Sequence, residues 1–398
     1  MPLLPPLALL AALLVTAGLA RSGLGARLAA RPLLTLVLAA AAGLALRASG
    51  LPGPPPEAVR EAARLGLAFL GFAAAQQCRP SRLGHVSLPA LRLTLIALPL
   101  VAAGATAVTF ALLPGVGLRP AALVGVAFAL GGGVFDEGAA MGAPLDPDVK
   151  RTVRLDTAAG LALGVPLAAL TEAAFVPPDP SAALWDYAGL KLFAGAAVGG
   201  TIGLLGARLL RVRDASVPLA PLLAFALAFA TCRALGFDAV MGGAACGLLY
   251  AEEAGLLGPV RSRIVGAGLR WVAPPALLAA GLLLGPILTD ANLLMLLAAS
   301  ATLLVLAPIA RGAALGGTAL PGTARAFLAR FGGMPGVGAA LFLLTLLASP
   351  ALGGQSEALA LGVIGLFGGV AIGRLASGPL VTRQVRAAAR ARRRRYAT

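Results

Sequence analysis

The stretch LGGGVFDEGAAM, residues 130–141, places three glycines and two adjacent carboxylates inside an apolar run. The chain around it has 398 residues, of which 59% are hydrophobic and only 12% are charged. A soluble globular chain carries roughly 25% charged residues. Apolar segments of about 20 residues, the length that crosses a bilayer as a helix, follow one another along the chain. The composition therefore predicts an all-α polytopic membrane protein.

Proline, glycine and charged residues divide the apolar sequence into about thirteen candidate transmembrane helices. The loops between them are short and leave no room for a soluble domain. We therefore expect a single transmembrane transporter domain over residues 1–382 and a basic cytoplasmic tail over residues 383–398. The first apolar run, residues 7–20, could instead be a signal peptide, but it lacks the preceding positive charge that signal peptides carry.

The basic residues predict how the chain is oriented in the membrane. Cytoplasmic loops of membrane proteins are enriched in Lys and Arg. Alternate loops of this chain hold clusters of basic residues, whereas the intervening loops read PGPPP, PPDPS and LTDAN. Thirteen spans then place the N-terminus outside and the C-terminus in the cytoplasm. We expect the plasma membrane, the inner membrane of a bacterium, as the location.

Several classes of function are disfavoured by the sequence. The formal net charge is +16, but the basic residues lie between apolar runs and not on one solvated face, so nucleic acid is not an expected partner. The sequence contains no GxxxxGK[ST] motif, so an ATP-driven pump is not supported. The three cysteines form no CxxC pair and His85 is the single histidine, so we expect neither a metal site nor a cofactor. The sequence shows no convergent cluster of His, Ser or carboxylate residues, so an enzyme is not expected.

Two segments of the chain combine an apolar helix pattern with an internal break. Secondary transporters often contain two inverted repeats, each with a helix interrupted by Gly or Pro near the middle of the membrane. The fifth and twelfth predicted helices fit this description, and an odd separation makes them antiparallel, as an inverted repeat requires. Close packing of helices against glycine is the alternative. The residues expected to form the two breaks are Gly131, Gly132, Gly133, Gly332, Gly333, Pro335 and Gly336.

An ordered series of segments resembles a known family from about residue 60 to residue 383. The matching segments are LGLAFLGFAAAQQCRPSRL at 65–83, VKRTVRLDTAAGLALGVPLAAL at 149–170, GFDAVMGGAACGLLYAEE at 236–253, RFGGMPGVGAALFLLTLL at 330–347 and FGGVAIGRLASGPLVTR at 367–383. In order and spacing they resemble the monovalent cation:proton antiporters of the Na+/H+ exchanger type. The resemblance implies exchange of Na+ or K+ for H+ by alternating access, which is a solute:proton antiporter activity.

The same resemblance implies a homodimer in the lipid bilayer. The first helices and the glycine-rich helix that follows residue 190 are the candidate contact surfaces.

The family's signature residues are missing from the matched positions. Gly131, Gly132 and Gly133 stand where the family has Thr-Asp-Pro, and no carboxylate stands near Ala158 and Gly160, where it has Asn-Asp or Asp-Asp. The family's ion ligands therefore cannot be transferred to this chain. A degenerate, non-transporting or regulatory membrane protein that keeps the antiporter fold is the main alternative function. A third alternative is a passive conduit or a transporter of a different solute. A pore requires a continuous polar stripe, and the sequence shows none.

Two other carboxylates could carry the exchange. Asp136 lies one helical turn after Gly132 and so on the same helix face, and a break shifted by one turn would bring it near the place of the missing aspartate. Asp156 lies inside the next predicted helix, where a carboxylate is costly unless it is paired or used, and Thr157 beside it could add a hydroxyl ligand. Asp156 is interpreted either as a displaced ion ligand or as a structural acid paired with Arg154 or with a basic residue on another helix.

Two basic residues inside predicted helices are candidates for charge compensation. Arg374 lies deep in the last predicted helix, which is the inverted partner of the helix that holds Asp156, so an Asp156–Arg374 pair is one hypothesis. Lys191 can extend its amine to the membrane surface. Of the remaining acids, Glu172 is expected at the outer rim of its helix, and Asp238 is expected to cap the helix that follows it.

Overall fold

The structure is a computed structural model, and its described part consists of helices and the turns that connect them. The described residues contain no β-strand, in agreement with the all-α prediction. These residues are 38, 41–42, 44–45, 48–49, 55–76, 78, 87–113, 116–130, 144–175, 187–209, 219–254, 293–331, 337–347, 379–386 and 389–390.

Eleven α-helices and two π-helices are resolved in these ranges. The α-helices are α4 (Pro56–Ala75), α5 (Leu88–Arg92), α6 (Leu98–Leu112), α7 (Leu118–Ala129), α9 (Pro147–Phe175), α11 (Ala194–Leu209), α12 (Leu219–Ala234), α13 (Ala239–Glu253), α15 (Leu293–Ala314), α16 (Gly322–Phe331) and α17 (Val337–Leu347). The π-helices are η2 (Leu93–Ala97), which joins α5 to α6, and η3 (Tyr187–Phe193), which leads into α11.

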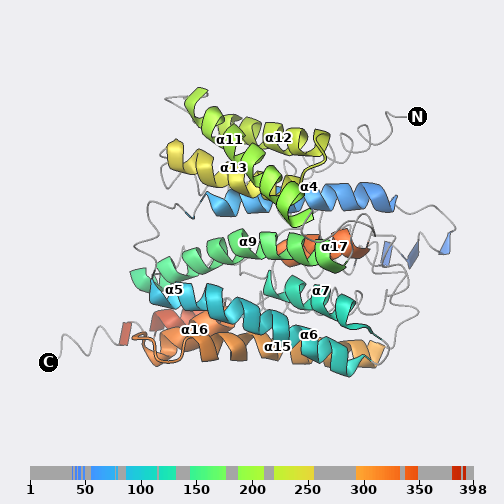
Figure 1. Ribbon diagram of the computed structural model, residues 1–398. Helices are drawn as coiled ribbons and strands as arrows, with labels where there is room; N and C mark the ends of the chain where they lie inside the picture. The colour runs from blue at the N-terminus through green and yellow to red at the C-terminus, as the bar shows by residue number, and fades with distance from the viewer. Residues whose placement is uncertain are drawn as a thin grey trace.

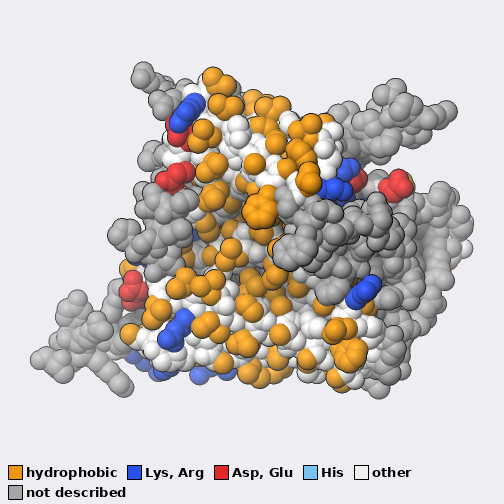
Figure 2. Space-filling model, in the orientation of Figure 1, with side chains coloured by type: hydrophobic (Ala, Val, Ile, Leu, Met, Phe, Trp, Pro, Cys, Tyr) orange, Lys and Arg blue, Asp and Glu red, His pale blue; other side chains and the backbone are white. Residues whose placement is uncertain are grey.

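Three helical stretches of the described chain are long and apolar enough to cross a membrane: Leu88–Leu112, Pro147–Glu172 and Leu190–Leu209. Figure 2 shows apolar side chains across the middle of one face, with charged side chains gathered toward its left and right edges. A band of apolar surface between two charged rims is the arrangement that a bilayer requires. The protein is therefore an integral membrane protein.

The helices form two groups (Figure 1). The glycine-packed group consists of α4, α11, α12 and α13, and the ion-pair group consists of α5, η2, α6, α7, α9, α15 and α16. Helices α9 and α17 both contact α4 and thereby join the two groups. The apolar window of α9 is 56% buried, against 22% for the stretch Leu88–Leu112, so α9 is a central helix whereas α6 lies at the periphery.

Glycine lets the backbones of α11, α13 and α4 touch directly. A Cβ atom on Gly199 of α11 would lie closer than 3.0 Å to the carbonyl oxygen of Gly242 on α13, and a Cβ atom on Gly247 would lie equally close to the carbonyl oxygen of Phe72 on α4. Such small residues at four-residue spacing are typical of helix contacts in membranes. The glycine face of α11, considered above as a dimer surface, is thus buried within one chain. Its members are Gly195, Gly199 and Gly203.

Several predictions concern residues outside the described part of the chain. These are Asp136, Arg374 and all the glycines and the proline of the two expected helix breaks. The structure shows that α7 ends at Ala129, that α16 ends at Phe331 and that α17 begins at Val337. The helix breaks, the inverted repeats and the count of about thirteen helices remain predictions.

Candidate functional site

Asp156 lies within α9, the helix of the ion-pair group that contacts α4 of the glycine-packed group. Its side chain is only 7% exposed. Among the described residues it is the single acidic residue in the buried class, and its neighbour Thr157 is buried as well. An ionised carboxylate in such a place is strongly disfavoured unless a cation compensates it.

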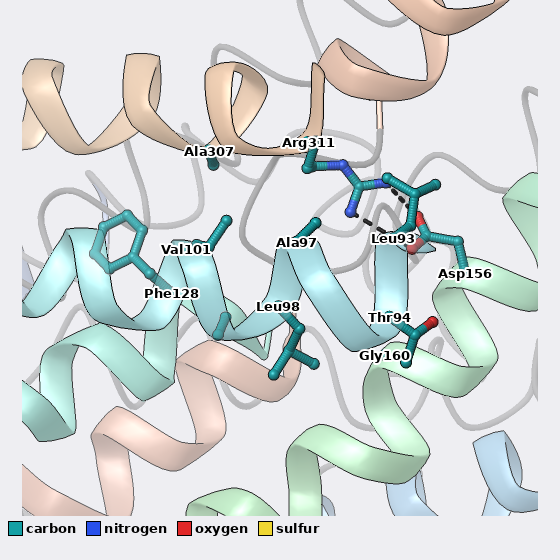
Figure 3. Close-up of a pocket in the computed structure, with 11 residues that line it drawn as sticks. Leu93, Thr94, Ala97, Leu98, Val101, Phe128, Asp156, Gly160, Ala307 and Arg311 are labelled. Carbon is teal, nitrogen blue, oxygen red and sulfur yellow. Dashed lines mark hydrogen bonds and ion pairs between the residues drawn. The ribbon is translucent and has the colours of Figure 1, made fainter. Parts of the chain in front are cut away.

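Arg311, near the end of α15, supplies that cation. Its Nη2 atom forms an ion pair and hydrogen bond with Oδ2 of Asp156, and its Nη1 atom donates to Oδ1 at 3.5 Å (Figure 3). Nη2 also donates to the carbonyl oxygen of Leu328 on α16 at 3.4 Å. The guanidinium therefore connects α9, α15 and α16. Its Nε atom is buried without a hydrogen-bond partner.

Arg311 is not among the candidate residues that the sequence suggested. It belongs to the last turn of α15, which continues to Ala314. Pairing of Asp156 with a basic residue on another helix was one of the alternatives left open, and this is what the structure shows. Arg154 is exposed on α9, and Arg374 lies outside the described residues.

A small cavity of about 20 Å³ lies beside the ion pair. This volume is of the order needed for one water molecule, and thus also for a small ion. The π-helix η2 lines the cavity with Leu93, Thr94 and Ala97, and Gly160 of α9 lines it as well (Figure 3). Short π-helical segments within α-helices are frequent at functional sites.

Gly160 explains part of this free space. It stands in the segment where the resemblance places a pair of ligand side chains, and having no side chain it leaves the volume open. The side-chain oxygens that line the cavity belong to Asp156 and Thr94, and the Thr94 hydroxyl donates to the carbonyl oxygen of Ala90 at 3.0 Å. The lining thus offers one carboxylate and one hydroxyl oxygen, which are the ligand types that hard cations accept.

Gln76 is a second buried polar residue without an evident structural role. It is fully buried at the C-terminal end of α4, and neither its amide nitrogen nor its amide oxygen has a hydrogen-bond partner among the described residues. Each such group in a native structure requires an explanation, because an unpaired buried polar atom lowers stability. The sequence had shown it only as part of the polar patch QQCRPSRL, residues 76–83.

Other predicted residues lie away from this site. Lys191 lies in η3 and lines a second, larger cavity, together with Glu172. Glu172 accepts hydrogen bonds from Arg60 and Arg64. Asp238 caps α13 by accepting a hydrogen bond from the Met241 amide at 2.8 Å, as predicted.

The cysteines serve packing in the described structure. Cys78, Cys232 and Cys246 are free thiols, and Cys232 donates from Sγ to the carbonyl oxygen of Gly195 at 3.6 Å. Cys78 lies beyond the end of α4, where burial raises its pKa to about 11 and keeps the thiol neutral. The described residues contain no group of three or more His, Cys, Asp or Glu side chains that could hold a metal ion.

Comparison with known proteins relates this architecture to a transporter. No protein-family model matches the chain, and no curated protein matches it. A structure of the sodium proton antiporter MjNhaP1 from Methanocaldococcus jannaschii at pH 8 matches with a TM-score of 0.64 and 17% identity, covering 96% of this chain and 99% of that one.

An electron-microscopy map of the same antiporter matches with a TM-score of 0.58 and 17% identity, covering 87% of this chain and 90% of that one. Both matches extend over most of the two chains, so the resemblance concerns the whole architecture. The chain therefore has the fold of a cation:proton antiporter.

Proposed function

We propose that the protein is a secondary transporter that exchanges a monovalent cation, Na+ or K+, for H+ by alternating access. In this proposal it acts in the plasma membrane with its N-terminus outside, and it is not an enzyme. The observation that carries the proposal is a buried carboxylate, Asp156, next to a cavity of ion size in a chain with an antiporter fold.

A single buried carboxylate is sufficient for coupling. Its ionised form binds a cation and its protonated form carries H+, and it cannot do both at once. If the site opens to the two sides in turn, each cation that leaves is replaced by a proton that enters. Thr157 and Thr94, which neighbour the carboxylate in sequence or line the same cavity, are proposed as hydroxyl ligands.

Arg311 is the internal competitor for Asp156. In the observed state its guanidinium occupies both carboxylate oxygens, so a proton or a cation must displace it. An uncompensated buried charge costs several kcal/mol. Arg311 therefore compensates the ionised Asp156 carboxylate when neither a cation nor a proton is bound to it. We propose that the pair closes when the site is empty and opens when an ion or a proton binds.

The division into two helix groups supports the alternating-access part of the proposal. The glycine-packed group holds its helices by direct backbone contact, which suits a rigid frame. The ion-pair group, which carries Asp156 and Arg311, is the proposed moving part, and the contacts of α9 and α17 with α4 form the boundary at which it moves.

Asp136 is proposed as the second candidate carboxylate. A shift of the helix break by one turn would bring it near the place of the family's missing aspartate, and it lies outside the described residues. Substitution of Asp136 by Asn separates the two candidates: loss of exchange in this variant alone would assign the carrier role to Asp136 and leave the Asp156–Arg311 pair as a structural link.

One observation favours a second function. Asp156 is neutralised by Arg311, and Ala158, Ala159 and Gly160 offer no further carboxylate beside it. A membrane protein that kept the antiporter fold and lost transport would have this arrangement, with the ion pair serving only to hold α9 to α15. Such a protein would act through its interactions with other membrane components.

Proton flux in sealed liposomes distinguishes the two functions. Purified protein is reconstituted with a pH-sensitive dye inside an acidic lumen, and Na+, K+ or Li+ is added outside. Cation-dependent alkalinisation of the lumen, absent from protein-free liposomes, is the expected result. No flux at any pH from protein that is demonstrably folded would contradict antiport and favour the non-transporting alternative.

A further inference from the structure

A second cavity, of about 190 Å³, lies where the two helix groups meet. Its walls come from α4, α9, η3, α12, α17 and the beginning of α13. Glu172, in this wall, is sixteen residues after Asp156 on α9, which corresponds to about 24 Å along the helix. The cavity is therefore separate from the site around Asp156.

Basic side chains predominate in this cavity. Four of them line it: Arg60, Arg64, Lys191 and Arg233.

Three acidic side chains face this basic cluster. Glu172 and Asp238 line the cavity, and Glu61 pairs with Arg233 at 2.8 Å. Four basic and three acidic side chains leave an excess of one positive charge among the described residues. A partly buried excess charge attracts a counter-ion, because the low-dielectric surroundings strengthen the attraction.

The acidic side chains of the cluster are shared between arginines, because Glu61 pairs with Arg64 at 3.7 Å as well as with Arg233. Arg60 and Arg64 both donate to the same oxygen, Oε1 of Glu172, at 3.1 and 3.0 Å. The Nε atom of Arg60 is buried and has no hydrogen-bond partner in the described part of the chain. A guanidinium presents its donors in a planar fork that fits two oxygens of one oxyanion. The cavity thus has donors, positive charge and space in one place.

We propose that this cavity binds a phosphate group, held by Arg60, Arg64, Lys191 and Arg233. The group is either free phosphate or the headgroup of an anionic lipid, since both present the same oxygens. The binding site is distinct from the Asp156 site, and the positive charge disfavours cations at this end of the boundary between the helix groups.

Phosphate binding is measured by equilibrium dialysis of the detergent-solubilised full-length protein against radiolabelled inorganic phosphate, with gluconate to hold the ionic strength constant. Saturable binding of about one phosphate per chain is expected. Lys191→Gln and Arg233→Gln are each expected to weaken it about tenfold, because each removes one charge-assisted contact.

A second experiment tests whether the bound phosphate group belongs to a lipid. Native mass spectrometry compares retention of phosphatidylglycerol with that of phosphatidylcholine by the same proteins. Preferential retention of phosphatidylglycerol that Lys191→Gln and Arg233→Gln both reduce, without binding of inorganic phosphate, identifies a lipid headgroup as the ligand.

Arg208→Gln is the matched control. It also removes one positive charge, but from the C-terminal end of α11, whereas Lys191 lies just before the N-terminal end of that helix. Arg208 is exposed, pairs with Glu253 and does not line the cavity, so this variant is expected to bind like the wild type. Thermal unfolding without ligand shows that the variants remain folded. The proposal is overturned if neither ligand binds saturably, or if Arg208→Gln weakens binding as much as the two cavity variants do. Neither measurement depends on transport.

Discussion

The glycine-packed group and the ion-pair group hold their helices together in opposite ways. In the first, α11, α13 and α4 meet backbone to backbone, because Gly199 and Gly247 have no side chain at the contact. In the second, a carboxylate and a guanidinium are buried between helices, beside a cavity and a π-helix. Close apolar contact leaves no room for an ion, whereas the buried pair and its cavity provide both charge and space. This difference is the reason that we propose the glycine-packed group as the frame and the ion-pair group as the part that carries the chemistry.

The largest predicted effect comes from a substitution that disrupts the backbone contact between α11 and α13. Gly199→Leu is expected to lower the free energy of unfolding by more than about 5 kcal/mol, because even a Cβ atom would clash with the Gly242 carbonyl oxygen. This loss would leave little folded protein. Size-exclusion chromatography and thermal unfolding in detergent provide the measurement.

Gly312→Leu in α15 is the control for this clash. A Cβ atom at Gly312 would meet only the Ala329 Cβ atom, at an ordinary 3.9 Å, and the residue is exposed. Replacing glycine inside a helix by a good helix former is expected to raise the free energy of unfolding by about 0.5 to 1 kcal/mol. If both variants were equally well tolerated, the direct contact between α11 and α13 would be disproved.

The second effect breaks the ion pair. Arg311→Gln is expected to lower the free energy of unfolding by about 3 to 5 kcal/mol, because Asp156 is left as an unpaired buried charge. The double variant Asp156→Asn, Arg311→Gln is expected to recover most of this loss. Thermal unfolding of the two single variants and the double variant gives the coupling between the two residues. Additive losses would show that the two side chains do not interact.

The smallest effect concerns the buried amide at the end of α4. Gln76→Leu is expected to raise the free energy of unfolding by about 1 to 3 kcal/mol in the absence of added ions, because it removes two unpaired polar atoms. Thr109→Val, which removes an unpaired buried hydroxyl from α6, serves as a parallel case with a smaller gain. A loss of stability in Gln76→Leu would show that the amide has a bound partner in solution.

Composition and local pattern predicted the parts of the fold that depend on local physics. Apolar runs of bilayer length predicted the helices, and Asp238 was correctly expected to cap α13. Asp156 was singled out because a carboxylate in an apolar helix requires compensation. These inferences needed only neighbouring residues, so one sequence was enough to make them.

Contacts between distant segments could not be read from the pattern. Arg311 lies 155 residues from Asp156, so the local pattern around either residue does not indicate that the two side chains meet. The nearest neighbours of Gly199 and Gly203 on α11 are backbone atoms of α13, and backbone atoms have no sequence signature. The second cavity was missed for the same reason, because its basic residues come from three separate elements.

The central claim is that exchange runs through the Asp156 carboxylate, and the most direct test is proton flux through the double variant Asp156→Asn, Arg311→Gln in liposomes. This variant keeps the site free of unpaired charge, so it is expected to fold but to show no cation-dependent flux. Glu253→Gln, which alters an acid outside the site, is expected to transport like the wild type. Flux at the wild-type rate through the folded double variant would contradict the account and would move the carrier role away from Asp156.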